Sequence, residues 1–538
     1  MSDSPAKEVS ESPTVERREA YQNNTQQKTN KHGIILVPQP SDDSADPLNW
    51  PLWKKNGTLG IISLASLAGA MQDLANASGL FPQAIAYNTT VTRLTYTLSA
   101  SAAGIGFGPL FWTPLALRLG RTACIFWGTL LSMVFNIWAA TCTDQGDYIQ
   151  FVLARMFAAL AASASITIGA TIVVDIFFLH EHGCAYAVYI LCCVIGPTTG
   201  PTLSGFIVQT QDWPVQFYHN IALEGFVCIL AFLFLNETGY ARPQVNADGT
   251  GTIPTVVYPE IPKSFLANRT ATFITGKVVP RKTTGELLYS AVLPFLIFIT
   301  PVGFMAGMVL FVNFGWGVAV NTLQSVYLQS PGEAGGYGFS PLQNALFTFS
   351  SWAGIACAQI YGLLFNDRIP IWVCKRFGKG VWKPEYRLHT LWAMILFMFP
   401  TGMGLYAASL QYHLHYMVLA LAQFLMFWGG SAAVPTIVNY VVECFGDHGN
   451  EVSAYLNFMR VVFGLTIPFY ITPWTEAVSV GWVFGTMALL SVGVFGFIIA
   501  LIAKGHELRE FKTWGIKAHS EEGTMLVQYD TATVVNVH

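Results

Sequence analysis

Four ionisable residues lie inside long apolar stretches of the sequence: Asp73, Arg155, Glu224 and Arg460. Each stretch is long enough to cross the ~30 Å hydrocarbon core of a bilayer as a helix, which takes roughly 20 residues. Placing a charge at the centre of such a helix costs ~2.5–3.5 kcal/mol on insertion scales, so an intramembrane charge marks a functional site by default. Acids and bases in this setting can take up protons, hold a counter-ion or bind a charged ligand.

The depths of these residues follow from a helical rise of 1.5 Å per residue. Asp73 lies ~13 Å and Arg155 ~10 Å from the outer ends of their spans, so we expect the two side chains at nearly the same level. Glu224 falls near the midplane, where it either accepts a proton or cation or bonds a neighbouring helix. Arg460 is expected one to two turns inside its span, within reach of Glu443 or Asp447, in a latch role.

The composition defines the class of protein. Of the 538 residues 53% are hydrophobic and only 11% are charged, against about 25% charged in average soluble proteins. A nucleic-acid binder would need a basic face, so that class is excluded. The sequence holds no GxxxxGK[ST] phosphate loop and no HExxH or CxxC motif. We therefore expect an integral membrane protein that is not an enzyme and has no metal or cofactor.

Apolar runs predict twelve transmembrane helices in two sets of six. The first set is expected at about 57–82, 94–116, 122–142, 148–174, 184–208 and 215–236. The second set is expected at about 296–328, 342–365, 388–409, 415–440, 452–473 and 480–503. Pro294 and Pro301 suggest a separate segment leading into the seventh span, because proline removes a helical donor.

Basic residues fix the expected orientation. All but three of the 28 lysines and arginines fall in the tails and loops of one side, and the exceptions are Arg93, Arg155 and Arg460. By the positive-inside rule that side is cytoplasmic and holds both termini. The expected parts are a disordered tail (1–56), an N-terminal bundle (57–238), a cytoplasmic linker (239–286), a C-terminal bundle (287–503) and a cytoplasmic tail (504–538).

Two glycine-rich strings carry a family resemblance. GPLFWTPLALRLGRT, from Gly108 to Thr122, joins spans 2 and 3 and resembles the inner-loop motif of the major facilitator superfamily. The resemblance implies gating roles for its two glycines and two arginines. Leu117 replaces the usual acid, so either the ionic latch is altered or Asp175 takes the acid's place. The gating residues of this string are Gly108, Arg118, Gly120 and Arg121.

The second string is GPTTGPTLSG in span 5, which resembles the antiporter motif of drug:proton exchangers. Its glycines and prolines would permit bending or, in the alternative interpretation, close helix packing. Its gating residues are Gly196, Pro197, Gly200, Pro201 and Gly205.

Shorter strings point to the fungal drug:proton antiporter-type branch. They are DPLNWPLWKK before span 1, KPEYRL before span 9 and Asn236-Glu237-Thr238 closing span 6. A further string, GLLFNDR from Gly362 to Arg368, resembles a second-half echo of the inner-loop motif and implies gating roles for Asp367 and Arg368. The resemblance implies an all-α integral membrane protein with 12 transmembrane helices in two pseudo-symmetric six-helix bundles. It makes spans 1 and 4 neighbours, so an Asp73–Arg155 pair becomes plausible, and it links Arg155 to proton transfer. The alternative is a structural ion pair that never titrates.

The implied activity is proton-coupled export of organic compounds (drugs, toxins or secondary metabolites) by alternating access. The alternative is uptake of organic cations or polyamines. Expected partners are a small organic substrate, protons and the bilayer; we expect a monomer in the plasma membrane, or else in the vacuolar membrane. Polar and aromatic residues on the lining spans are the substrate-binding candidates: Gln72, Asp73, Asn76, Tyr189, Asn313, Trp316, Asn321, Gln324, Asn344, Gln423, Trp428 and Asn457.

Overall fold

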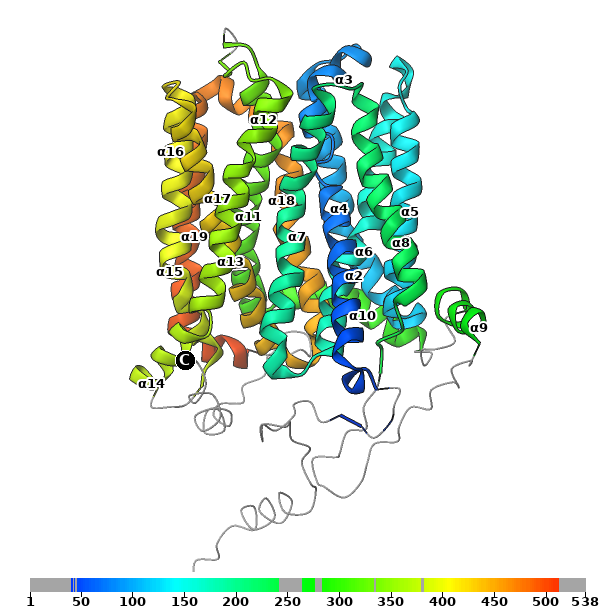
Figure 1. The fold of residues 1–538 in the computed structure, drawn as a ribbon. Coiled ribbons are helices and arrows are strands. Elements are labelled where there is room, and N and C mark those ends of the chain that lie inside the picture. Colours follow the sequence, from blue (N-terminus) through cyan, green and yellow to red (C-terminus); the bar gives the residue numbers. More distant parts are fainter. Residues whose placement is uncertain are drawn as a thin grey trace, which may run out of the picture.

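The computed structural model describes residues 40–41, 43, 46–240, 264–275, 283–332, 335–378 and 382–511. Every regular element among them is helical, and Figure 1 shows long helices running side by side between two ends. We call the end where α2 begins and α19 finishes the tail end, and the opposite end, with α3 and α12, the loop end.

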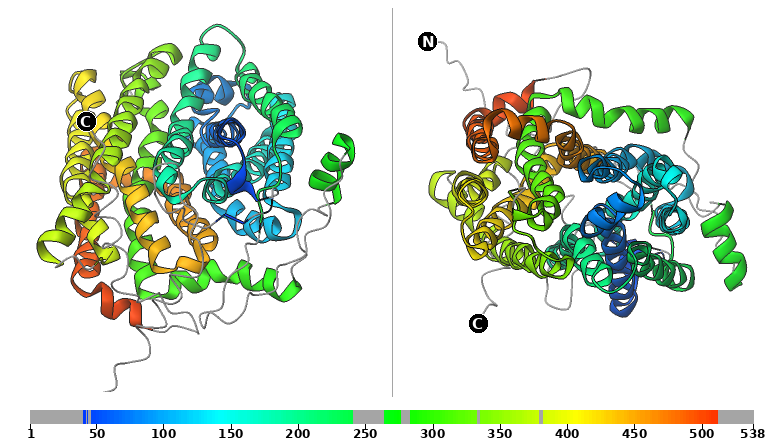
Figure 2. Two further views of the ribbon diagram at one scale, coloured as in Figure 1. Left: turned by 60° about the horizontal axis from the view of Figure 1, so that its bottom comes forward. Right: turned by 90° about the horizontal axis from the view of Figure 1, so that it is seen from above.

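The first half of the chain forms one group of helices. They are α2 (Leu52–Met71), α3 (Leu80–Ala86), α4 (Val91–Leu119), α5 (Arg121–Thr141), α6 (Tyr148–Ile176), α7 (Leu179–Val208) and α8 (Tyr218–Phe234). A short helix α9 (Phe265–Thr270) follows at the tail end, outside this group (Figures 1 and 2).

The second half forms the other group. Its helices are α10 (Thr284–Ile299), α11 (Pro301–Gln329), α12 (Pro341–Phe347), α13 (Phe349–Phe365), α14 (Arg368–Phe377), α15 (Leu391–Ala393), α16 (Phe399–Gln411), α17 (Tyr416–Cys444), α18 (Gly449–Val478) and α19 (Val480–Glu510).

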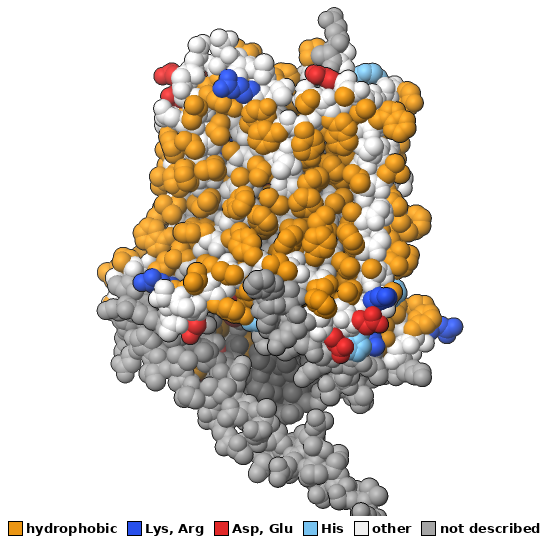
Figure 3. Space-filling model, turned by 180° about the vertical axis from the view of Figure 1, so that it is seen from behind, with side chains coloured by type: hydrophobic (Ala, Val, Ile, Leu, Met, Phe, Trp, Pro, Cys, Tyr) orange, Lys and Arg blue, Asp and Glu red, His pale blue; other side chains and the backbone are white. Residues whose placement is uncertain are grey.

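Ten helical segments in the described residues are long and apolar enough to cross a membrane. Two more helices, α2 with 20 residues and α13 with 17, run beside these ten segments. Neither of the two meets the criterion of length and apolar character by itself. A band of apolar side chains covers the middle of the surface, with charged side chains above and below it (Figure 3). The chain is therefore an all-α membrane protein, as predicted.

Local chemistry explains several helix ends. Thr90 and Thr300 accept backbone hydrogen bonds at the starts of α4 and α11, as N-cap residues do. Gly120 has φ +99° between α4 and α5, a conformation that L side chains rarely adopt. Thr300 and Pro301 separate α10 from α11, which agrees with the predicted segment before span 7.

One predicted boundary differs from the structure. The tail predicted as disordered to residue 56 includes a 3-10 turn at Pro47–Asn49 and the first turn of α2. The buried carboxylate of Asp46 accepts the backbone N–H of Leu48 and fixes this turn. At the other end α19 is kinked at Lys504, directly after the predicted end of the last span at residue 503. A second, short helical segment then runs to Glu510 and is held by an ion pair between the buried Arg509 and Glu385.

Candidate functional site

The first span is broken at the level of Asp73. Helix α2 ends at Met71, residues 72–76 form turns, and helical structure resumes at Ala77–Gly79 and in α3. Sequence reasoning predicted one continuous helix here. A break frees main-chain carbonyl groups, which inside a membrane must find partners in the protein. Transporters commonly place such discontinuous helices at their binding sites.

Arg155 of α6 supplies those partners. Its Nη2 donates to the carbonyl oxygen of Gln72 at 2.6 Å and is 3.4 Å from that of Asp73. The guanidinium is fully buried and lies over the ring of Phe217, 5.5 Å from the centroid. The structure therefore brings Asp73 and Arg155 together as predicted, but the hydrogen bonds run to main-chain oxygens, because the helix is unwound at this point.

The carboxylate of Asp73 remains available. The residue is 5% exposed, and its Oδ1 is buried without a hydrogen-bond partner. An unpaired polar atom in such a place costs free energy unless a ligand, a proton or water satisfies it. Asp73 lies on the wall of the central cavity.

Glu224 of α8 lies in a closed polar cluster within the N-terminal group. Its carboxylate accepts from Ser132 Oγ at 2.5 Å, Asn136 Nδ2 at 2.9 Å and Asn220 Nδ2 at 3.4 Å. Asn220 also donates to the side chain of Gln72 at 2.9 Å. A chain of buried polar groups therefore runs from Glu224 through Asn220 to the broken segment.

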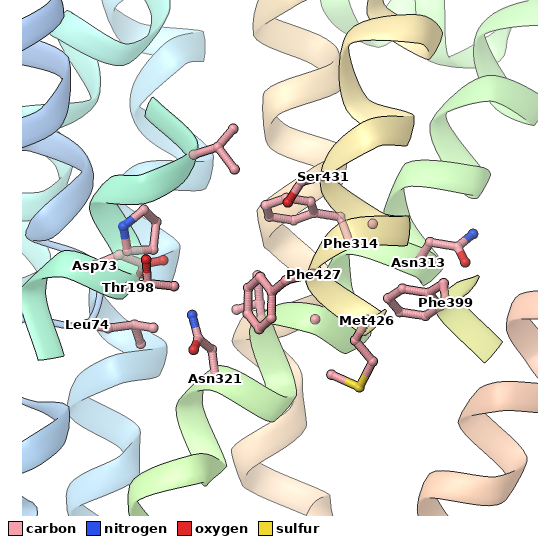
Figure 4. A pocket seen from close by; sticks show the side chains of 15 residues that line it. Asp73, Leu74, Thr198, Asn313, Phe314, Asn321, Phe399, Met426, Phe427 and Ser431 are labelled. Atoms are coloured by element: carbon pink, nitrogen blue, oxygen red, sulfur yellow. The ribbon is translucent and has the colours of Figure 1, made fainter. Parts of the chain in front are cut away.

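The central cavity lies between the two groups of helices and has about 560 Å³ of empty space, including the part open to solvent. Figure 4 shows Asp73, Leu74 and Thr198 on one side, and Asn313, Phe314 and Phe427 on the other. The lining residues are Asp73, Leu74, Val194, Pro197, Thr198, Asn313, Phe314, Gly317, Val318, Asn321, Phe399, Met426, Phe427, Gly430 and Ser431.

Three of the predicted substrate residues line this cavity: Asp73, Asn313 and Asn321. Three others form a buried amide network in the second half, where Gln324 bonds Asn344 at 3.2 Å and Gln423 at 2.7 Å. Their polar groups are directed to one another, so they hold helices together and do not line the cavity.

The remaining substrate candidates are packed elsewhere. Gln72 is bonded to Asn220, and Asn76 donates to Thr97 at 2.9 Å. The hydroxyl of the fully buried Tyr189 donates to the carbonyl of Ile166 at 2.6 Å.

The last three candidates are on α11, α17 and α18. Trp316 packs edge-on against Phe463, and Trp428 packs against Phe424. Asn457 donates to the carbonyl oxygen of Ile105 on α4 at 3.4 Å.

Sequence reasoning missed the apolar part of the cavity wall. Phe314, Phe399, Met426 and Phe427 line it. Aromatic residues are frequent throughout the spans, so nothing in their spacing separated cavity residues from residues that face lipid. The one sequence signal that pointed to part of this cavity wall was Pro197-Thr198 within the span-5 motif.

The inner-loop motif forms an ionic contact across helix ends. Arg121 pairs with Asp175 at the end of α6. This agrees with the alternative in which Asp175 takes the place of the acid that Leu117 replaces. Glu237 accepts from the backbone N–H of Arg121 at 3.1 Å and from the hydroxyl of Thr122 at 2.7 Å. It therefore caps the start of α5.

Gly108 of this motif serves close packing, whereas Gly120 forms the turn with positive φ. A Cβ at Gly108 would lie 2.9 Å from the carbonyl oxygen of Leu160 on α6. Arg118, by contrast, has an exposed side chain at the end of α4.

The span-5 motif packs α7 against the broken helix and against the other half. A Cβ at Gly196 would lie 3.1 Å from Met71 N, and one at Gly200 would lie 2.5 Å from Met71 O. A Cβ at Gly205 would lie 2.7 Å from Ala345 of α12. The carbonyl oxygen of Pro201 accepts from Ser78 at 2.7 Å. Close packing is thus established for this motif at the site of the break.

The second half repeats the ionic arrangement. Arg387 lies 2.5 Å from Glu443 and 3.5 Å from Asp367, while Arg368 is exposed. Arg460 was predicted to lie within reach of Glu443 or Asp447, and Glu443 is engaged by Arg387. Arg460 instead donates to Asn457 at 2.6 Å and lies over the ring of Phe314, a cavity residue. The reason is depth, because Arg460 is eleven residues beyond the start of α18 at Gly449.

The two halves touch at the loop end. Thr202 and Thr348 hydroxyls are 2.5 Å apart, Asn344 donates to Ser78 at 3.3 Å, and Leu342 donates to Gln209 at 3.2 Å. At the tail end Thr171 donates to Asn450 at 2.8 Å. The contacts at the loop end join α7 and the broken span to α12 and α13, and the contact at the tail end joins α6 to α18.

Two helical groups around a central cavity, with one broken span and ionic contacts at helix ends, define a membrane transporter. The profile of the Major Facilitator Superfamily matches residues 62–382. The chain belongs to the Major Facilitator Superfamily, and it is therefore a transporter and not an enzyme.

Similar proteins agree with this assignment. The efflux pump radE of Floropilus chiversii is 26% identical over 488 residues, which cover 88% of this chain and 85% of that one. The MFS-type transporter hepF of Aspergillus oryzae is 24% identical over 491 residues, covering 88% and 94%.

Solved structures show the same fold. The human organic anion transporter MFSD10 has a TM-score of 0.53 at 14% identity, and the match covers 84% of this chain and 100% of the MFSD10 chain. The proton:xylose symporter XylE has a TM-score of 0.55 at 12% identity, covering 83% and 96%.

Proposed function

We propose that this transporter exports small organic compounds in exchange for protons, by alternating access. The observation that carries the proposal is the Asp73 carboxylate, which lies on the cavity wall with an unpartnered oxygen at the break in α2. One group that binds either a proton or substrate is sufficient for exchange, because the two compete for it. The efflux pump radE is similar over most of the chain, which supports export.

The proton-coupling residues of the proposal are Asp73, Arg155 and Glu224. Arg155 holds the unwound backbone beside Asp73, so a change in the charge of Asp73 acts directly on that segment. Glu224 is connected to the same segment through Asn220 and Gln72. A proton on Asp73 would weaken its attraction to the nearby cation.

The cavity favours substrates with a large apolar part and a positive charge. Phe314, Phe399 and Phe427 present aromatic surface, which attracts organic cations through the ring face. Asp73 supplies the counter-charge. The same features suit uptake of organic cations, so the direction of transport must be measured.

The proposed orientation places the tail end in the cytoplasm. Basic residues collect at that end. We place the protein in the plasma membrane as a monomer, with no nucleic-acid partner.

The test is flux in vesicles. The full chain is reconstituted, and uptake of radiolabelled tetraphenylphosphonium is followed with the vesicle interior acidified. Exchange predicts that uptake depends on the pH gradient. It also predicts that acidification of the outer medium reverses the direction of flux. Asp73→Asn should abolish the dependence on pH, whereas Asp212→Asn, in an exposed loop at the loop end, should keep it. Uptake that follows the cation gradient alone in both variants would reject proton coupling.

A further inference from the structure

A second cavity lies on the flank of the bundle, under helix α10. It is lined by Leu110 of α4, by Pro294, Phe295 and Phe298 of α10, and by Tyr455, Phe458 and Met459 of α18. We call it the α10 crevice. It shares no residue with the central cavity, and its empty space is about 420 Å³, including the part that opens outward.

The crevice lies where the two halves meet. Helix α4 belongs to the first group and α18 to the second, and α10 packs against both (Figure 2). Ser290 of α10 donates to Glu451 of α18 at 2.7 Å and holds this position. Phe107 and Phe458 pack edge to face across the same seam, with ring centroids 5.1 Å apart.

The lining offers an occupant no free polar group. Six of the seven side chains are purely apolar, and the seventh, Tyr455, already donates its hydroxyl to the carbonyl of Gly303 at 2.9 Å. An apolar space of this kind is filled by apolar ligands and not by water. Polar or ionic ligands are excluded on the same ground.

The mouth of the crevice is continuous with the surface that faces lipid. Phe295 is 51% exposed and Phe298 is 36% exposed, and both belong to the apolar helix α10. Leu110 is nine residues before the last residue of α4, which places it about 13 Å from the tail end of that helix. The crevice therefore opens into the hydrocarbon of the leaflet on the tail-end side. The groups available there are the acyl chains of phospholipids.

We propose that the α10 crevice binds the acyl chain of a membrane phospholipid from the leaflet on the tail-end side. Because α4 and α18 lie in different halves, the site changes shape whenever the halves move relative to each other.

The crevice is also adjacent to the central cavity. Phe458 and Met459 face the crevice, while Asn457 and Arg460 on the same turn of α18 contact Ile105 and Phe314. An occupant of the crevice thus presses on the turn that carries Arg460 toward the cavity. This inference does not depend on export or proton coupling.

The experiment is photolabelling of the full chain in phosphatidylcholine vesicles that contain phosphatidylcholine with a diazirine in one acyl chain. After irradiation, adducts are located by mass spectrometry. We expect adducts on Phe458 and Met459, although Met459 is only 5% exposed. Leu489 of α19, which is 68% exposed, supplies the reference for ordinary contact with lipid. The fully buried Ile467 of α18 supplies the background.

Two variants decide the outcome. Leu110→Trp fills the crevice and should remove the adducts at Phe458 and Met459 while those at Leu489 remain. Phe295→Ala widens the mouth and should increase them, so the inference stays testable if Leu110→Trp does not fold. Adducts at the level of Ile467, or adducts unchanged in both variants, overturn the proposal. Loss of adducts when excess tetraphenylphosphonium is added would assign the crevice to that ligand and overturn it as well.

Discussion

Arg155 donates a 2.6 Å hydrogen bond to the carbonyl oxygen of Gln72, where helix α2 is broken. The arginine and the break therefore depend on each other. Without the guanidinium, the freed carbonyl oxygens would lie unpaired in a membrane, and without the break the arginine would have no main-chain acceptor. The carboxylate of Asp73 is left with a buried oxygen that has no hydrogen-bond partner.

Replacing Arg155 should therefore affect stability as well as transport. Arg155→Ala leaves the carbonyl of Gln72 unpaired, at a cost of about 1.5–3 kcal/mol for a hydrogen bond from a charged group. Arg155→Lys keeps a charged donor and should recover part of that loss. Thermal unfolding in detergent measures both variants. Equal melting temperatures for the wild type and Arg155→Ala would contradict the bonding role.

Two substitutions of Glu224 can separate its role as a hydrogen-bond acceptor from its role as a charged group. Glu224→Leu leaves the donors of Ser132 and Asn136 without an acceptor, and each buried unsatisfied group costs about 1–3 kcal/mol. Glu224→Gln keeps one acceptor oxygen and removes only the charge.

We expect a large fall in melting temperature for Glu224→Leu and a small one for Glu224→Gln. If Glu224 takes part in proton coupling, Glu224→Gln also changes the dependence of flux on pH. If the dependence of flux on pH is unchanged in a stable Glu224→Gln variant, Glu224 serves only as a hydrogen-bonding link between α5 and α8.

The sequence predicted the fold well because its signals are local. Apolar runs and basic loops are set by the bilayer, and each can be recognised without knowing the neighbours. The twelve expected spans differ from the observed helices in span 1, where no proline or glycine lies between Met71 and Asn76. They differ also in span 8, interrupted at Thr348, and in span 9, which contains a π-helical segment at Met394–Met398. At the break in span 1 Arg155 bonds the main chain, and hydropathy cannot show such a tertiary contact.

The site was predicted less completely for a related reason. Intramembrane charges are rare, so Asp73, Arg155 and Glu224 were identified individually, and the structure places them in one connected region. Uncharged polar residues such as Gln324 and Tyr189 bond to each other or to backbone. Whether such a residue faces a cavity or a neighbouring helix depends on helix rotation, which the sequence alone leaves open.

The buried ion pair of Glu385 and Arg509 offers a test of packing away from the cavity. Arg509 Nε is 2.9 Å from Glu385 Oε1, and both residues are buried. Removing one partner of a buried pair typically costs about 3–5 kcal/mol. Glu385→Leu should therefore destabilise strongly, and Glu385→Leu with Arg509→Met should be more stable than the single variant. A double variant no more stable than Glu385→Leu would contradict this pairing.

The contact between Thr202 and Thr348 gives a direct test of movement between the two halves. Their hydroxyl oxygens are 2.5 Å apart, one on α7 and the other beside α13. Alternating access requires these helices to separate, because the cavity must open at the loop end in one part of the cycle. A disulfide between Thr202→Cys and Thr348→Cys would prevent that separation.

Oxidation of the double variant should abolish flux of tetraphenylphosphonium, and reduction should restore it. The single variants Thr202→Cys and Thr348→Cys, treated in the same way, control for reaction at the native cysteines. Binding of the ligand to the oxidised protein should persist, because the crosslink retains the arrangement in which Asp73 lies on the cavity wall. Full flux through the crosslinked protein would show that the halves need not part at Thr202 and Thr348, and the cycle would then require another opening.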